Sequence, residues 1–284
     1  MTIEAQESRR AALLVAPALI WTAAFFILPF GAMIWLSLSS MQGRAIMPGP
    51  DFGNYIRIFT DPSLRQGLWN SLQITLAVTV ISVVLAWPLA WIIAMRVPAR
   101  WQRLALLLAV LPFWTSYVVR SYAWLLVLGQ NGVLNKALTG LGLAAAPLEI
   151  VATRGATLVG FVHFFVMLLT LTIYANLIQL SSNYARAAAD LGAGTFATFR
   201  HVILPLTLPG VMTGAFLTFV LCIGDYITPQ ILGGNNELTL PQLIMLQLGR
   251  RGDFPMASAL SILLMAVVTL AYAACARWLR MERL

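Results

Sequence analysis

Long uncharged stretches separate short charged ones along this chain of 284 residues. Apolar and polar positions do not alternate within these stretches, as they would in the strands of a membrane barrel. A helix needs about 20 apolar residues to cross a hydrocarbon core of roughly 30 Å, and it satisfies its own backbone hydrogen bonds in lipid. We therefore predict an all-α integral membrane protein with six spanning helices. Their expected ranges are about 11–38, 67–95, 104–128, 155–180, 206–229 and 255–277.

The composition agrees with a membrane protein. The chain is 60% hydrophobic and only 10% charged, so too little polar sequence remains to coat a large soluble core. The first apolar stretch is too long for a cleavable signal peptide, and no A-x-A site ends it before the following loop. Because it follows Arg9 and Arg10, we expect it to be retained as the first helix.

The net charge of +8 would suggest nucleic acid in a soluble protein, but here the positive-inside rule accounts for it. With an even number of helices, ten basic residues fall on one face, which we predict to be cytoplasmic, and seven fall on the other, in longer loops mixed with acids. The ten are Arg9, Arg10, Arg96, Arg100, Arg103, Arg186, Arg200, Arg277, Arg280 and Arg283. The seven are Arg44, Arg57, Arg65, Lys136, Arg154, Arg250 and Arg251.

These predictions divide the chain into one membrane domain with two short tails. Both termini are expected in the cytoplasm, as tails 1–10 and 278–284 around a domain spanning 11–280. Loops 96–103 and 181–205 are expected inside, and loops 40–65, 129–154 and 230–253 outside. The segments 131–143 and 237–255 are predicted to form short interfacial helices, the second closed by Gly249. No internal repeat supports an inverted-repeat secondary transporter.

The segment "RAAADLGAGTFATFRHVILP", residues 186–205, is unusually rich in small residues for a loop between two membrane helices. It predicts a short helix that ends at Gly192, where a left-handed C-cap is needed, and a second helix capped by Thr195. Phe196 and Phe199 would form an apolar contact stripe. Pro205 suits the first turn of the fifth helix. An amphipathic connector resting on lipid headgroups is the alternative.

The spacing A-A-x-x-x-G, followed after nine residues by a branched aliphatic residue, any residue and L-P, resembles the "EAA" coupling loop of ABC importer permeases. Ala187, Ala188, Gly192, Val202, Leu204 and Pro205 occupy the matching positions. Arg186 stands where the family usually has Glu, which removes a carboxylate that would contact the ATPase subunit or the local helix. The resemblance implies that the loop docks on a cytoplasmic ATPase. The residues assigned to coupling are Arg186, Ala187, Ala188, Asp190, Gly192, Phe196, Phe199, Leu204 and Pro205.

Three further segments, 111–135, 224–234 and 250–262, resemble the permeases of spermidine/putrescine importers, and the similarity runs over about residues 10–280. It implies a six-helix bundle of the type I importer permease (MetI-like) fold in the bacterial inner membrane. It also implies a periplasmic solute-binding protein, a second permease that forms a heterodimer with this one, and an ATPase dimer. The same machinery for another solute, such as an amino-acid derivative or opine, is the alternative.

No phosphate-binding loop of the form G-x-x-x-x-G-K-[ST] occurs in the sequence. ATP and Mg²⁺ are therefore expected to be bound and hydrolysed by the partner subunit, with no cofactor on this chain and no nucleic acid.

Arg120 and Asp225 are charges expected in or near the membrane, where ionisable residues usually serve function. Asp225 could attract a cationic amine, and Trp114, Tyr117 and Tyr226 could offer cation–π faces. Arg120 could pair with Asp225 and hold an outer gate shut. Alternatively, Arg120 snorkels to headgroups, Asp225 caps the loop after the helix, and the aromatics pack or form an interfacial belt.

Other polar and helix-breaking residues have simpler expected roles. Pro112 and Pro229 are predicted to kink or unwind the third and fifth helices. Asn70 and Ser71 are expected to make helix-packing contacts rather than to bind a ligand.

Catalytic chemistry finds little support. The two histidines, His163 and His201, lack H-E-x-x-H spacing, and no G-x-S-x-G occurs. His163 is expected to be a packing or pathway residue rather than a metal ligand. Cys222 and Cys275 lie near opposite membrane faces, as separate core thiols. We therefore predict a transport subunit without a catalytic or metal site, over a self-sufficient secondary transporter or channel and over a membrane enzyme.

Overall fold

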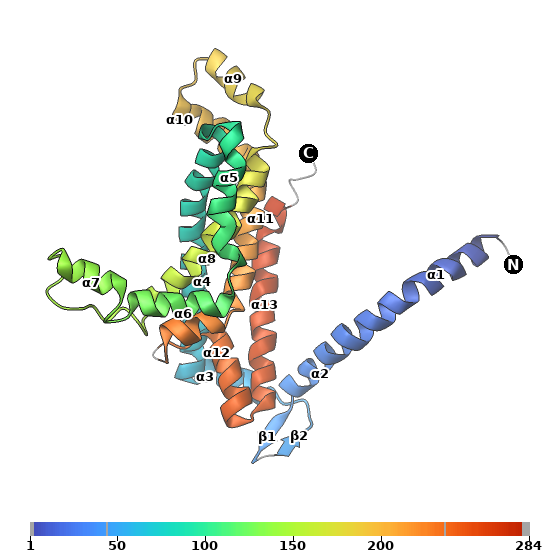
Figure 1. Cartoon of the computed structure of the whole chain (residues 1–284). Coiled ribbons are helices and arrows are strands. Elements are labelled where there is room, and N and C mark those ends of the chain that lie inside the picture. The colour runs from blue at the N-terminus through green and yellow to red at the C-terminus, as the bar shows by residue number, and fades with distance from the viewer. Residues whose placement is uncertain (1–2, 44, 236, 280–284) are drawn as a thin grey trace. The chain divides into compact units, whose positions relative to one another are not determined.

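The computed structural model describes residues 3–43, 45–235 and 237–279. The chain forms two compact units. The hairpin unit comprises the described residues up to Leu64 together with Ile244–Leu263, and the bundle unit comprises Arg65–Leu243 and the described residues from Leu264 onward. Both consist almost entirely of helices (Figure 1). Arg44, Arg280 and Arg283, and with them most of the predicted C-terminal tail, lie outside the described residues.

The hairpin unit begins with one long apolar helix made of α1 (Ile3–Thr22), the π-turn η1 (Ala23–Ile27) and α2 (Leu28–Ser37). Pro29 explains the π-turn, because proline has no N–H and its ring clashes with the carbonyl four residues earlier. Leu28 donates its N–H to the oxygen of Ala23 instead, which widens the helix without breaking it. The apolar window within Leu13–Ser37 contains no residue that is buried within the hairpin unit.

A short hairpin and a polar clamp follow this helix. β1 (Ser40–Gln42) pairs antiparallel with β2 (Ala45–Met47). Asn54, on α3 (Gly53–Thr60), donates its side-chain amide to the oxygens of Ser37 at 3.2 Å and Ser39 at 2.7 Å. The unit also holds the end of α12 (Leu240–Leu246), the π-turn η6 (Gln247–Arg251) and the start of α13 (Phe254–Leu279).

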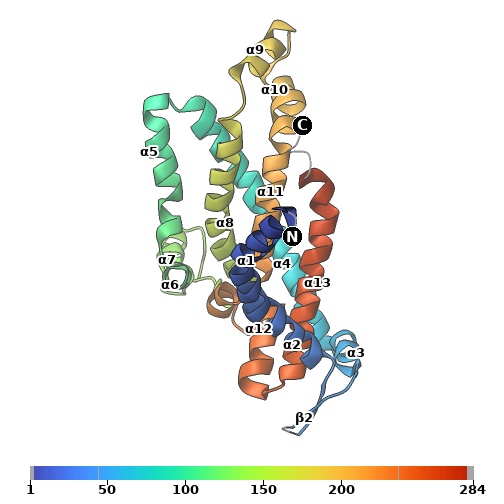
Figure 2. The same ribbon diagram turned by 90° about the vertical axis from the view of Figure 1, so that its right-hand side faces the viewer.

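In the bundle unit, α5, α8 and α11 run alongside one another, with α9 and α10 at one end and α6 and α7 at the other (Figures 1 and 2). Of the expected loops that lie wholly in this unit, 96–103 and 181–205 fall at one end and 129–154 at the other. Its elements are α4 (Pro62–Trp91), η2 (Ile92–Arg96), α5 (Ala99–Val110), η3 (Leu111–Trp114), α6 (Tyr117–Leu128), α7 (Val133–Gly140), α8 (Arg154–Leu177), α9 (Ser182–Asp190), α10 (Thr195–Thr198), η4 (Phe199–Ile203), α11 (Leu204–Ile223) and η5 (Pro229–Gly233).

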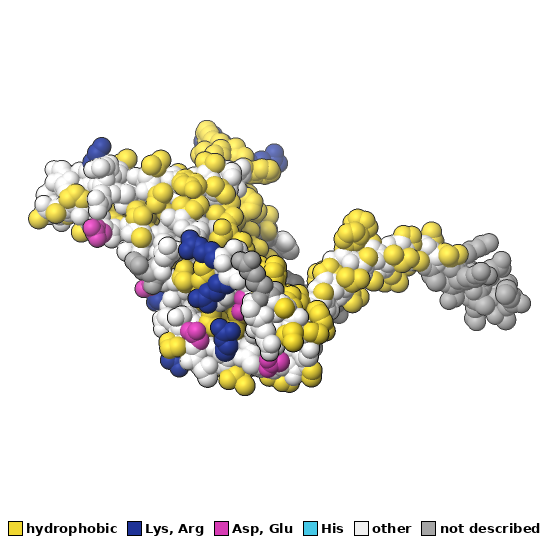
Figure 3. Space-filling model, turned by 90° about the horizontal axis from the view of Figure 1, so that it is seen from below, with side chains coloured by type: hydrophobic (Ala, Val, Ile, Leu, Met, Phe, Trp, Pro, Cys, Tyr) yellow, Lys and Arg dark blue, Asp and Glu magenta, His cyan; other side chains and the backbone are white. Residues whose placement is uncertain are grey.

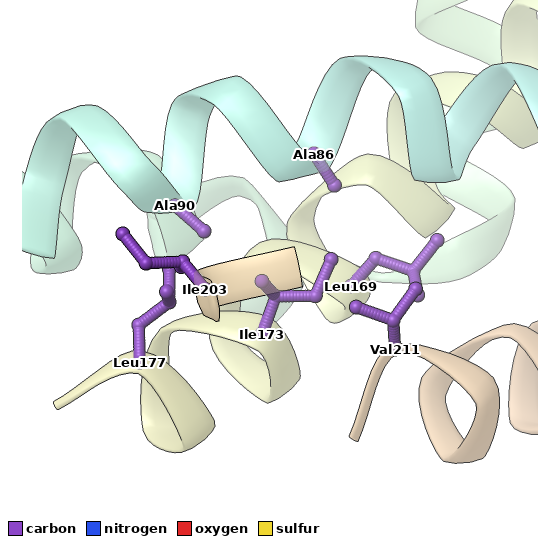
Figure 4. Packing of buried hydrophobic residues seen from close by; sticks show 7 residues of the cluster. All are labelled: Ala86, Ala90, Leu169, Ile173, Leu177, Ile203 and Val211. Atoms are coloured by element: carbon purple, nitrogen blue, oxygen red, sulfur yellow. The ribbon is translucent and has the colours of Figure 1, made fainter. Parts of the chain in front are cut away.

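A buried apolar cluster joins α4, α8 and α11 near the end that carries α9 (Figure 4). Two alanines of α4 face larger side chains of the other two helices, so the α4 backbone can lie close to them. The cluster consists of Ala86, Ala90, Leu169, Ile173, Leu177, Ile203 and Val211.

The contact between α8 and α11 depends on two glycines spaced four residues apart. A Cβ at Gly210 would overlap the amide of Asn176, and one at Gly214 would lie 2.8 Å from Cδ2 of Leu169. Both glycines therefore leave room for side chains of α8. This small-xxx-small pattern is the usual way in which membrane helices pack closely, because lipid provides no hydrophobic force between them.

The third predicted span differs from a single helix over 104–128. Among the described residues five helices are long and apolar enough to cross a membrane, and a bent pair, Ala99–Trp114 and Tyr117–Gly140, makes a sixth if it counts as one span; its bend is 92°. Pro112 lies in the 3₁₀ turn before the bend, and Thr115 and Ser116 are extended. The predicted unwinding at Pro112 is confirmed, since the chain leaves the helix within this turn.

Three other local expectations are wrong. The fifth helix ends at Ile223 rather than 229, so Pro229 begins the separate turn η5 and does not kink a helix. The short helix of 237–255 ends at Gly252, which has φ +64°, and not at Gly249. Gly194, not Thr195, is the N-cap of α10.

We expect Gly210→Leu to lower the free energy of unfolding by about 1–3 kcal/mol, because the new side chain overpacks the α8–α11 contact. Thermal unfolding of the purified chain in detergent measures this loss. Gly31→Leu in α2 is the matched control, since a Cβ there meets no atom within 4 Å. Equal stability of the two variants would show that the glycines do not set the helix spacing.

Candidate functional site

The segment between α8 and α11 is a short helix, a glycine bend and a second short helix. α9 ends in a Schellman motif: Gly192 donates to Ala189 O at 2.9 Å, and Ala193 donates to Ala188 O at 2.9 Å. Gly192 has φ +80°, a conformation in which any side chain would be strained. The predicted left-handed cap is confirmed, and it sets the direction in which the chain turns back toward the membrane helices.

Large apolar side chains of this segment are uncovered in the described chain. Leu191 is 89% exposed and Phe196 is 72% exposed, and Tyr184 of α9 is also exposed. Exposed apolar side chains that gather on a surface are typical of interaction sites. Arg186, Ala187 and Asp190 are exposed beside it, whereas Ala188 is buried.

The other side of the segment is fastened to α4. The ring of Phe199 packs edge-on against Trp87, with centroids 4.5 Å apart, and lies 6.4 Å from Trp91. Such aromatic pairs add about 0.5–1.5 kcal/mol beyond their buried area. Phe196 and Phe199 contact each other as predicted, with ring centroids 6.4 Å apart. Phe199 also anchors the segment to α4, whereas Phe196 is largely exposed.

α11 begins as α2 does, with a π-turn immediately before a proline. Leu204 donates its N–H to Phe199 O, which closes the π-turn η4 immediately before Pro205. Because Pro205 cannot donate, the wider turn lets the helix continue through it. The segment is thus joined to α11 by an unbroken helical backbone, and Pro205 lies within that helix.

A second group of predicted residues meets at the opposite end of the bundle unit. The hydroxyl of Tyr117 donates to Oδ2 of Asp225. The same carboxylate accepts the N–H of Ile227 at 2.8 Å and of Thr228 at 3.4 Å, and so orders the turn after α11. Capping of the loop by Asp225, one of the two roles considered, is therefore present, and Tyr117 is its side-chain partner.

Arg120 is buried, with only 7% of the residue exposed. Its guanidinium carbon lies 4.4 Å from the ring centre of Phe164 and 5.1 Å from that of Tyr117. Nη1 donates to Pro112 O at 3.3 Å, which braces the break in the third span. Aromatic faces attract a desolvated cation by about 2 kcal/mol.

The predicted Arg120–Asp225 ion pair is absent from the described part of the chain; Tyr117 lies between the two charges and contacts both. Snorkelling of Arg120 is likewise not observed, because the residue is buried. Trp114 is 84% exposed and Tyr226 is half-buried, and neither joins this group.

A small cavity adjoins Asp225. It is lined in part by Ser71, Thr75, Cys222 and Thr239, and only about 10 Å³ of it is open to the centre of a water molecule. That is room for about one water. The cavity is too small for an organic solute.

Polar residues of α4 hold the segment that follows η5. Asn70 donates to Leu238 O at 3.2 Å, and Ser71 accepts the N–H of Leu240 at 2.6 Å. Arg154, at the start of α8, forms an ion pair with Glu237 at 2.7 Å and donates to Asn70 at 3.0 Å. The expectation that Asn70 and Ser71 make packing contacts is met by these bonds.

Sequence reasoning missed several partners in these groups. Trp87 and Trp91 lie four residues apart and so form an aromatic stripe on one face of a helix. This spacing could have indicated a packing surface. Phe164 carried no signal. His163 accepts a hydrogen bond from Trp124 Nε1 at 3.0 Å, which agrees with a satisfied packing residue.

These features define a class: a multi-pass helical membrane permease with an exposed segment, bent at a glycine, inserted between two closely packed helices. Residues 76–280 match the family model "Binding-protein-dependent transport system inner membrane component". The chain belongs to this family. It is thus a permease subunit of the ABC importer type and not an enzyme.

The relatives are similar over most of their length. The chain is 31% identical over 262 residues to the spermidine/putrescine transport system permease protein PotB of Haemophilus influenzae, covering 91% of each. It is 31% identical to the inner membrane ABC transporter permease protein YdcU of Escherichia coli, covering 91% of this chain and 86% of that one.

A bacterial alginate ABC transporter, solved in complex with an alginate pentasaccharide-bound periplasmic protein, shares the fold. Its matching chain has a TM-score of 0.76 at 14% identity, covering 97% of each chain.

We expect Tyr117→Phe to lower the free energy of unfolding by about 1.5–3 kcal/mol, because Asp225 loses a hydrogen bond to its charged carboxylate. The ring that supports Arg120 stays in place. Thermal unfolding in detergent is the measurement, and Tyr122→Phe, on the exposed side of α6, is the control. A Tyr117→Phe variant as stable as its control would rule out this bond as a support of the site.

Proposed function

We propose that this chain is the permease subunit of an ATP-driven importer for polyamines such as spermidine and putrescine, or for a related small amine, across the bacterial inner membrane. The substrate class is supported by the relative named for spermidine/putrescine transport, which matches 91% of the chain. Another solute of the same importer class, such as an amino-acid derivative, is the alternative.

The observation that carries ATP-driven transport is the exposed segment of α9 and α10. Its apolar surface, with Leu191 and Phe196, is suited to a groove on a cytoplasmic ATPase. Because Phe199 packs on Trp87 and the segment continues into α8 and α11, a push on it moves three helices together. ATP and Mg²⁺ are held and hydrolysed by that partner, and this chain supplies the lever.

Three kinds of partner complete the proposal. A solute-binding protein delivers the amine from the periplasm, as the family name and the alginate transporter complex support. A second, homologous permease completes the pathway as a heterodimer, and an ATPase dimer binds below. Both termini and the α9–α10 segment lie on the cytoplasmic side in this arrangement.

The group of Tyr117, Arg120 and Asp225 forms the outer part of the pathway in this proposal. In the closed state Tyr117 occupies the carboxylate of Asp225, and the buried Arg120 disfavours a second cation nearby. When the bundle opens, an ammonium group of the solute takes the place of the hydroxyl. Trp114 and Tyr226 lie near this group along the chain and are proposed to face the solute once the bundle opens.

The test is uptake of labelled spermidine and putrescine by cells that lack this chain and receive it back in wild-type or variant form. We expect the wild type to restore uptake and Gly192→Pro to abolish it, because proline cannot adopt φ +80°. Gly194→Pro is the matched control, since Gly194 has φ −70°, which a proline ring fixes. It should retain most of the uptake.

The outcomes separate the parts of the proposal. Uptake that persists in Gly192→Pro would contradict the coupling role of the segment. Uptake without ATP or without a binding protein would indicate a secondary transporter. No polyamine uptake by a complex that assembles with its ATPase would exclude polyamines and retain the importer class.

A further inference from the structure

The hairpin unit contains a groove between the β1–β2 hairpin and the turn that joins η6 to α13. Its volume is about 480 Å³, and its lining includes Ile46, Arg250, Arg251 and Phe254. Ile46 and Phe254 are partly exposed, and both arginines are exposed. The groove thus combines an apolar floor with two cations at its edge.

Figure 3 views the molecule from the side of this hairpin. Basic and acidic side chains gather on that face, whereas the α1–α2 helix carries hydrophobic side chains along its length. The charged face is suited to water and to a soluble partner, and the helix to lipid.

The aspartates of the hairpin unit are already engaged in capping helices. Asp51 accepts the N–H of Gly53 at 2.7 Å, at the start of α3, and Asp61 accepts that of Ser63 at 2.8 Å, at the start of α4. Asp253 accepts the N–H of Met256 at 3.0 Å, at the start of α13. A carboxylate at a helix N-terminus is stabilised there by the backbone N–H groups, so each of these acids already has backbone partners.

One ion pair forms among the described residues of this unit, and it does not include the groove arginines. It joins Arg57 to Asp253 at 4.0 Å. Among the described residues neither Arg250 nor Arg251 contacts a carboxylate. Their charge is therefore available to a partner that brings its own acids.

The groove is open to a bulky partner because glycines form part of its edge. A Cβ added at Gly249 or at Gly252 would meet no atom within 4 Å. Gly252, with φ +64°, ends η6 and turns the chain into α13, so the position of the arginines is fixed by backbone geometry.

We infer that this groove receives an acidic ridge of the solute-binding protein, with carboxylates at Arg250 and Arg251 and an apolar side chain between Ile46 and Phe254. This inference rests on the proposed function, which places the groove on the periplasmic side. A positive groove attracts an acidic carrier and repels a free polyamine. Delivery by the carrier is therefore favoured over direct entry.

A binding protein is favoured over a lipid headgroup for two reasons. The groove is bounded by a β-hairpin and a glycine turn outside the long apolar stretches. The family is defined by its dependence on a binding protein.

The test uses the complete transporter in nanodiscs and the spermidine-loaded binding protein that supports its uptake. Binding affinity and ATPase stimulation are measured for wild type, for the double variant Arg250→Glu/Arg251→Glu and for Gly249→Trp. We expect each variant to weaken binding at least about tenfold, the first by charge reversal and the second by filling the groove. Basal ATPase activity without binding protein should be unchanged in both.

Matched controls are available on α7, outside the hairpin unit. Lys136→Glu changes an exposed charge, and Gly140→Trp adds the same bulk where a Cβ meets no atom within 4 Å. Both should bind like wild type. The affinity of the wild type for the binding protein should fall as salt is added. The affinity of the double glutamate variant should show a different dependence on salt concentration.

The results distinguish this inference from the proposed function. Equal affinity of wild type and both groove variants would overturn the groove as the docking site and leave the importer intact. Unchanged affinity together with loss of co-purified anionic lipid would assign the arginines to headgroups instead, which also overturns it. A wild type that binds no solute-binding protein and imports no polyamine would overturn both.

Discussion

The close contact between α8 and α11 is the constraint on which the rest of the bundle unit depends. Gly210 and Gly214 let α11 accept side chains of α8, and the alanines of α4 complete a buried cluster with them. The α9–α10 segment connects these same two helices. Because their contact is tight, the coupling proposed for the segment would transmit a force as a movement of the helices rather than absorb it within them.

Most of the fold could be predicted from the pattern of uncharged stretches, because each membrane helix must be apolar over about 20 residues. The glycine cap at Gly192 could also be predicted, since few other residues tolerate its conformation. The bend of 92° in the third span could not be predicted from the sequence. Pro112 signalled an interruption, but the direction of the chain after it depends on tertiary contacts such as that between Arg120 and Phe164.

The site was predicted less well, for the same reason. The sequence identified Tyr117, Arg120 and Asp225 as unusual residues in an apolar setting, but it favoured pairing the two opposite charges. In the structure a tyrosine hydroxyl satisfies the carboxylate and aromatic rings hold the guanidinium. Each of these side chains has several chemically reasonable partners. The choice among them depends on where three different elements place their side chains, and local sequence patterns do not predict this. Trp87 and Trp91 were overlooked because aromatic residues in a membrane helix are common.

In the proposed pathway, where an ammonium group of the solute replaces the Tyr117 hydroxyl, the engagement of Asp225 by three donors has a consequence for the selection of solutes. A carboxylate that accepts three hydrogen bonds releases one donor most readily in exchange for another, since leaving the bond unmade costs free energy. Primary and secondary ammonium groups carry N–H donors and can make this exchange with Tyr117. A quaternary ammonium group, such as that of choline or betaine, has the same charge but no N–H. Discrimination at this position would therefore follow the number of N–H bonds on the solute rather than its charge, and would exclude fully methylated amines of similar size.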